Sequence, residues 1–169
     1  VAVCLLICGV ALWDRRSEGQ KIIEARPLPP HPFTLKTAPT SQVYWRDSLN
    51  HTWAMLGRAS YFTDHQGSGV LFERETAMEF ERRRQLFAPL SFQREICMVF
   101  AGFDQNENWY AECAPDLELV VELCRAERGP DYLVFPFAMP RGAISSWTLS
   151  LPGAQPVTNH LHDCKQLRG

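Results

Sequence analysis

The sequence carries no excess of charge of either sign. Its 169 residues include 17 Lys or Arg and 19 Asp or Glu, so the formal net charge at pH 7 is −2. Proteins that bind nucleic acid or an acidic lipid surface through charge usually carry a basic patch or stripe. The three consecutive arginines at 82–84 spread around a helix beside the acids of 73–81, which is typical of a solvated face. A nucleic-acid partner is therefore not expected.

Motifs for metal, redox or cofactor chemistry are also missing. The four cysteines beyond residue 40 show neither a C-x-x-C nor a zinc-ribbon spacing, which argues against structural zinc and thioredoxin-like chemistry. The weak candidates are His160 and His162, because the segment H-L-H-D-C at 160–164 offers zinc-ligand types. No second ligand pair stands at a usual spacing. We expect a polar tail held by Cys164, with no metal and no other cofactor.

A catalytic motif is missing as well. A nucleophile elbow needs G-x-S-x-G on a strand-to-helix turn, whereas this chain has D-H-Q-G-S-G at 64–69. Glycines on both sides of Ser68 are typical of a flexible turn. Asp64 and His65 are adjacent and point apart in an extended chain, so they do not form one relay. A small hydrolase that uses Ser68 and His65, or a metal at the 160–162 tail, remains the alternative to a non-catalytic protein.

The longest uninterrupted apolar stretch lies at the N-terminus. Residues 1–13 contain no charged side chain, and Asp14, Arg15 and Arg16 follow. A membrane-spanning helix takes about 20 residues, a length that a few apolar residues ahead of Val1 would supply. We expect residues 1–23 to form a membrane-anchor-like helix. The alternatives are a remnant of a signal peptide and an apolar core helix.

Proline is concentrated just after this segment. Four prolines stand between residues 27 and 32, and proline lacks the amide hydrogen that helices and central strands need. Such a stretch favours extended polyproline geometry and a semi-rigid spacer. We expect residues 24–40 to form a proline-rich linker, or alternatively an arm packed along the domain surface. Residues 41–169 then form the folded domain.

The pattern of residues 41–169 predicts an α+β domain with a mostly antiparallel sheet and two helices on one face. The expected helices are 73–87, ended by Pro89, and 115–127. The segment 152–169 is expected to be mostly loop. The expected strands are 51–62 with 70–72 as one hairpin, 92–103 with 108–113 as another, and then 132–137 and 144–151.

The four cysteines of the domain predict two disulfides. If the turn of the second hairpin centres on Gln105, Cys97 and Cys113 stand opposite each other at a separation compatible with a disulfide. Cys124 and Cys164 then form the second pair and pin the tail. Four free thiols in a reducing compartment are the alternative. The apolar segment and the linker indicate export, which favours disulfides.

Together these patterns predict a non-catalytic, membrane-tethered protein-binding domain of the cell envelope, located in the periplasm or outside the cell. Such a domain acts as an accessory subunit, an assembly factor, or an inhibitor such as an immunity protein. Its partner is another, membrane-associated protein, and residues 1–23 hold it at the membrane. Tryptophan and tyrosine dominate binding hot spots, so Trp109, Tyr110 and Trp147 are the interface candidates.

Overall fold

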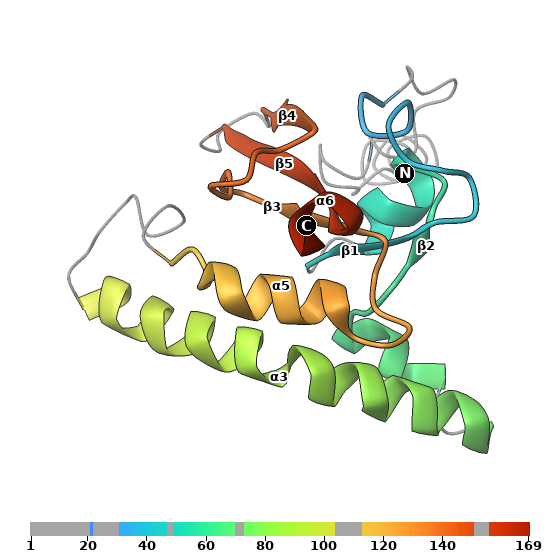
Figure 1. Ribbon diagram of the computed structural model, residues 1–169. Coiled ribbons are helices and arrows are strands. Elements are labelled where there is room, and N and C mark those ends of the chain that lie inside the picture. Colours follow the sequence, from blue (N-terminus) through green and yellow to red (C-terminus); the bar gives the residue numbers. More distant parts are fainter. Residues whose placement is uncertain (1–20, 22–30, 47–48, 70–72, 104–112, 151–155) are drawn as a thin grey trace, which may run out of the picture.

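The fold is that of a computed structural model, which describes residues 21, 31–46, 49–69, 73–103, 113–150 and 156–169. A five-stranded mixed sheet and helices form an α+β fold, which confirms the fold class expected from the sequence (Figure 1). The expected anchor helix 1–23, apart from Lys21, lies outside the described residues, as do residues 24–30 of the expected linker. Within the described ranges no helix is both long enough and apolar enough to span a bilayer.

The sheet has the strand order β2-β1-β3-β5-β4. Its strands are β1 (Gln42–Trp45), β2 (Ala59–Ser60), β3 (Tyr132–Phe135), β4 (Ser145–Leu149) and β5 (Val157–Asp163). β1 is parallel to β2 and β3, while β5 is antiparallel to β3 and β4. Parallel and antiparallel pairings are therefore balanced, where the sequence indicated mostly antiparallel pairing. Each parallel pair has the long connection that a parallel neighbour requires. Helical residues His51–Met55 lie between β1 and β2, and the long helix Arg74–Phe103 lies between β1 and β3.

Helices cover one face of this sheet. They are α3 (Arg74–Phe103), α5 (Leu117–Arg125) and the short α6 (Cys164–Arg168). In Figure 1, α3 and α5 run side by side below the sheet, and α6 follows β5 directly. A π-helix (His51–Met55) precedes β2, and a 3-10 helix (Asp64–Gly69) precedes α3.

α3 continues through Pro89, so the expected helix end at this proline and the expected strand 92–103 are both wrong. A proline inside a helix removes one backbone hydrogen bond. Pro89 is on the exposed side of α3, where the freed carbonyl can reach water. The buried side continues across the proline, because Phe87, Leu90 and the disulfide-bonded Cys97 follow one another at helical spacing. This packing holds the residues after Pro89 in the helix.

The expected strand 51–62 is also wrong, because this segment contains the π-helix and only the two-residue β2. The expected hairpin partners 70–72 and 108–112 lie outside the described residues. The expected helix 115–127 is confirmed as α5, and the last two expected strands are confirmed as β3 and β4.

The tail 152–169 was expected to be mostly loop, and instead it contains β5 and α6. β5 pairs with strands on both sides, yet its buried positions include Asn159 and His162. Polar side chains at buried positions break the apolar alternation that indicates a strand. After β5, the Asp163 carboxylate accepts a hydrogen bond from the Lys165 amide at 2.8 Å and begins α6.

Apolar side chains pack on both faces of the sheet. The core on the helical face includes Tyr44, Phe87, Leu133 and Phe135. The core on the opposite face consists of Phe33, Val43, Trp45, Leu56, Val134 and Leu161. Successive residues of β1 and β3 alternate between the two cores, and a strand that is covered on both faces has an uninterrupted apolar sequence. Phe33 lies in the 31–40 part of the expected linker, so this part packs against the domain as an arm.

Candidate functional site

The segment that carries Ser68 and His65, the residues of the alternative hydrolase interpretation, lies on the 3-10 helix Asp64–Gly69. His65 is exposed there, and the side chain of Ser68 lies outside the described part of the chain. Gln66 fixes the turn, because its Oε1 accepts from the Thr63 amide at 2.9 Å. A β-carbon at Gly67 would lie 3.1 Å from the Phe80 ring, so the glycine allows the turn to pack closely on α3. The described contacts of this motif are those of a turn docked on a helix.

The two weak metal candidates lie on β5. His162 is fully buried opposite Leu133, whereas His160 is half-buried opposite Phe135. Burial lowers the pKa of both imidazoles below 6.5, so both are neutral at pH 7. Among the residues that the structure describes, no three His, Cys, Asp or Glu side chains are grouped so as to hold a metal ion.

Both cysteine pairs expected from the sequence are joined. The Cα atoms are 5.5 Å apart in Cys97–Cys113 and 5.0 Å apart in Cys124–Cys164. The hairpin register that led to the first pair is wrong, because Cys97 lies on α3. The first disulfide ties the second half of α3 to the segment before α5, and the second ties α5 to the start of α6.

Removal of the Cys97–Cys113 disulfide is expected to lower the free energy of unfolding by about 2–3 kcal/mol. The bond joins residues 16 positions apart, and such a cross-link restricts the unfolded chain. Urea unfolding of the double variant Cys97→Ala, Cys113→Ala, followed by circular dichroism, measures the loss. A free energy of unfolding equal to that of the native protein would contradict this bond.

Trp147 is the described member of the three interface candidates, since Trp109 and Tyr110 lie outside the described residues. Its side chain is half-buried in an aromatic cluster. The Trp147 ring centroid is 4.5 Å from that of His31 and 6.1 Å from that of Trp45. These contacts favour a role for Trp147 in holding the N-terminal arm against β1.

Mild acid is expected to destabilise the protein through His31. This side chain is only 5% exposed, and burial, together with the nearby His51, lowers its pKa from 6.5 to about 4. Between these pH values the unfolded chain binds a proton that the folded chain does not bind. The stability contribution of neutral His31 is therefore present above pH 6.5 and is lost as the pH falls toward 4.

When the pH falls from about 7 to about 5, the lowered pKa of His31 alone is expected to reduce the free energy of unfolding by about 1–2 kcal/mol. Urea unfolding at the two pH values measures this change, and His31→Gln should reduce it. Equal stability of the native protein at both pH values would contradict a buried neutral imidazole.

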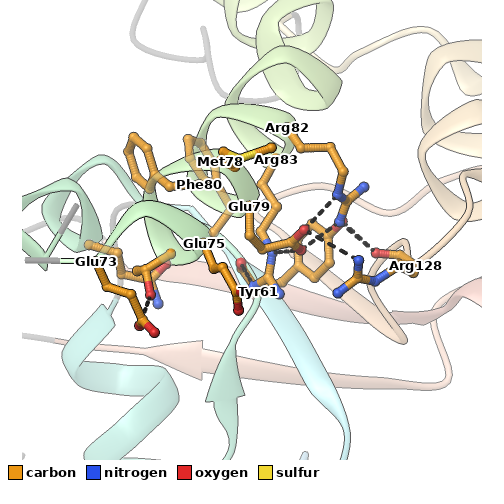
Figure 2. Close-up of a pocket in the computed structure, with 12 residues that line it drawn as sticks. Tyr61, Glu73, Glu75, Met78, Glu79, Phe80, Arg82, Arg83 and Arg128 are labelled. Carbon is orange, nitrogen blue, oxygen red and sulfur yellow. Dashed lines mark hydrogen bonds and ion pairs between the residues drawn. The ribbon is translucent and has the colours of Figure 1, made fainter.

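An open cleft lies between α3 and the turn at Arg128, with Glu79 at its centre (Figure 2). Glu79 accepts from Arg82 Nη2 and Arg83 Nε at 2.7 Å each, and Arg128 Nη1 lies 3.8 Å away. The hydrogen bonds from Arg82 and Arg83 lower the pKa of Glu79 to about 2. The Tyr61 hydroxyl donates to the Arg128 carbonyl at 2.7 Å. Glu73 and Glu75 also line this cleft, so three carboxylates balance three guanidinium groups in its described lining. The contacts of Glu79 fasten the turn to α3, and the cleft does not indicate an external anion.

An exposed apolar face on the second half of α3 was missed by the sequence-based reasoning. Phe92, Ile96, Val99 and Phe100 recur at the spacing of one helical side. Phe92 is 66% and Phe100 is 65% exposed. We refer to these four side chains as the α3 apolar face. In the sequence, the helical spacing of these four residues was the one indication of such a face. The same short run of β-branched and aromatic residues also favours a strand.

Comparisons with known proteins give no match to this chain. Neither protein-family models, nor curated proteins, nor solved structures match it. Its function therefore has to be inferred from its own residues.

Proposed function

We propose that this chain is a non-catalytic, membrane-tethered protein-binding domain of the cell envelope, and that the α3 apolar face is its binding surface. It serves as an accessory subunit, an assembly factor, or an inhibitor such as an immunity protein. The observation that carries the proposal is the exposure of Phe92, Ile96, Val99 and Phe100 on one side of a helix. A contiguous exposed apolar patch is typical of an interaction site.

The polarity of α3 changes along its exposed side. Glu81 and Gln85 lie on this side in the first half, and Glu81 is hydrogen-bonded to Arg84 at 2.6 Å. From Phe92 onward the same side carries the α3 apolar face. The charged first half resembles an ordinary solvated helix. We therefore expect the partner to contact only the apolar second half of α3.

The opposite side of α3 supports a preorganised binding surface. Phe87 and Leu90 are buried against the sheet, and the Cys97–Cys113 disulfide fastens the helix to the segment before α5. A surface that is ordered before association loses less conformational entropy on binding. The α3 apolar face can therefore bind without a preceding rearrangement of the helix.

Two features support placement on the exported side of a membrane. The disulfides are typical of an oxidising compartment. The apolar residues 1–13 suit a tether. The alternative of a small hydrolase at Ser68 and His65, or of a metal enzyme at His160 and His162, gains no support from the described contacts of those residues.

Site-specific photocrosslinking in the cells that produce the protein tests this proposal. The full chain carries p-benzoylphenylalanine in place of Ile96, within the α3 apolar face, or in place of Thr148, an exposed position on β4. Irradiation is expected to give a discrete protein adduct from position 96 and not from position 148.

The adduct should disappear when Phe92→Ser is added to the position-96 chain, because an anchoring aromatic residue contributes about 2 kcal/mol or more. The absence of an adduct at position 96, or the same adducts from both positions, would contradict a binding surface on α3.

A further inference from the structure

The second half of α3 has little packing against the domain. Leu90 is the last buried residue of this helix, and none of the described side chains from Ser91 to Phe100 is buried. Figure 1 shows the last turns of α3 extending beyond the start of α5. An isolated helix shorter than about 12–15 residues is marginal in water, and residues 91–103 fall within this length. Their helical structure therefore depends on how they are attached.

The segment before α5 provides the attachment. It is joined to α3 by the Cys97–Cys113 disulfide and by Gln93, whose Oε1 accepts from the Asp116 amide at 3.3 Å. This distance is long for a hydrogen bond. Arg94 lines a small pocket together with Cys113 on the same side of the helix. The disulfide is the covalent link among these contacts, and it is the one nearest the end of α3.

Pro89 separates this half from the rest of the helix. A proline inside a helix removes one backbone hydrogen bond, so α3 is weakened at this position. Phe87 and Leu90 on either side of it are held in the core on the helical face of the sheet. The first half is fastened independently by the contacts of Glu79 with the turn at Arg128. A change beyond Leu90 can therefore stay local.

The two disulfides differ in their exposure. Cys124 and Cys164 are both 0% exposed and belong to the core on the helical face. Cys97 is partly exposed and stands between the exposed Ile96 and Met98. A thiolate attacks a disulfide only at a sulfur that it can reach. In the folded domain, Cys97 is thus the open position for such an attack, and the buried pair is closed to it.

We propose that the Cys97–Cys113 disulfide is a redox switch, and that its reduction by a dithiol loosens the second half of α3 while Cys124–Cys164 stays intact. The oxidised protein presents the ordered α3 apolar face, and the reduced protein does not. The loss of partner binding on reduction rests on the proposed function of this face. The loosening of the helix does not depend on it.

The reduction is a thiol–disulfide exchange. One thiolate of the dithiol attacks Sγ of Cys97, and the bond to Cys113 breaks with its electron pair on Sγ of Cys113, which takes up a proton. The second thiol of the reductant then attacks the mixed disulfide and releases Cys97, which is protonated in turn. The reductant ends as a disulfide, and the protein gains two electrons and two protons.

Brief treatment of the native full chain with dithiothreitol, followed by alkylation and peptide mapping, tests the selectivity. Cys97 and Cys113 are expected to become alkylated at least about hundredfold faster than Cys124 and Cys164, because a buried disulfide reacts only after the domain opens. The buried disulfide in the same molecule is the matched control. Equal rates for the two bonds, or no reduction of Cys97–Cys113 in the folded protein, would overturn the proposal.

Hydrogen exchange on the selectively reduced protein tests the loosening. The amides of residues 92–103 are expected to exchange at least about tenfold faster than in the oxidised protein, whereas those of α5 and β5 keep their rates. Unchanged exchange of residues 92–103 would contradict a switch in α3. Equal acceleration throughout the domain would contradict it as well, because the disulfide would then stabilise the whole fold rather than this half of the helix.

The double variant Cys97→Ala, Cys113→Ala separates this bond from other effects of the reductant. Its residues 92–103 should exchange at the rate of the reduced protein, both with and without dithiothreitol. Further acceleration by dithiothreitol in this variant would assign the effect to another bond and overturn the proposal. These measurements need no partner, so their failure is distinguishable from a failure of the α3 apolar face in photocrosslinking.

Discussion

Replacing Phe87 with alanine is expected to lower the free energy of unfolding by about 3–5 kcal/mol. Phe87 is 1% exposed, and its ring centroid lies 4.1 Å from that of Tyr44, 5.7 Å from that of Tyr61 and 5.8 Å from that of Phe62. Removal of the ring leaves a cavity that these neighbours fill only in part. Urea unfolding gives the value directly.

Phe92→Ala is the matched control, because it makes the same change on the opposite side of α3. Phe92 is exposed, so this substitution should change the free energy of unfolding by less than about 0.5 kcal/mol. The pair of variants tests the continuation of α3 through Pro89. Equal losses from the two substitutions would mean that Phe92 is buried, as it would be on a strand of a core sheet.

The second large effect is expected on binding. Once crosslinking has identified the partner, Phe92→Ser combined with Phe100→Ser should reduce its affinity about thousandfold, since each anchor contributes about 2 kcal/mol or more. Both side chains are exposed in the free domain, so stability should stay within about 0.5 kcal/mol of the native value. Calorimetry with the purified partner measures the affinity.

Met78→Ser is the control for this variant. Met78 is exposed on the same side of α3, but in the half that carries the charged residues. It lies away from the α3 apolar face, so its replacement should leave the affinity unchanged. Equal losses from Met78→Ser and from the double variant would indicate a general effect of α3 rather than a defined surface.

The strands β3 and β4 and the helix α5 could be predicted from the sequence because local pattern and tertiary packing agree there. They disagree at Pro89. The proline and the aromatic and β-branched residues after it favour a helix end and a strand. Contacts of Leu90 and Cys97 with distant parts of the chain override that preference. The α3 apolar face depends on the same segment, so it could not be recognised from a strand interpretation.

The disulfides were predictable for a different reason. A disulfide requires only that two cysteines approach each other, and a helix followed by a returning segment meets that condition as well as a hairpin does. The pairs were therefore right although the hairpin was wrong.

Hydroxyl-radical footprinting of the unmodified protein, free and in its complex with the crosslinked partner, tests the central claim most directly. In the free domain Phe92 and Phe100 should be oxidised readily, because about two thirds of each side chain is exposed. In the complex both should be protected, while Met78 on the same helix is oxidised at the rate of the free protein. Unchanged oxidation of Phe92 and Phe100 in the complex would contradict a partner-binding surface on α3.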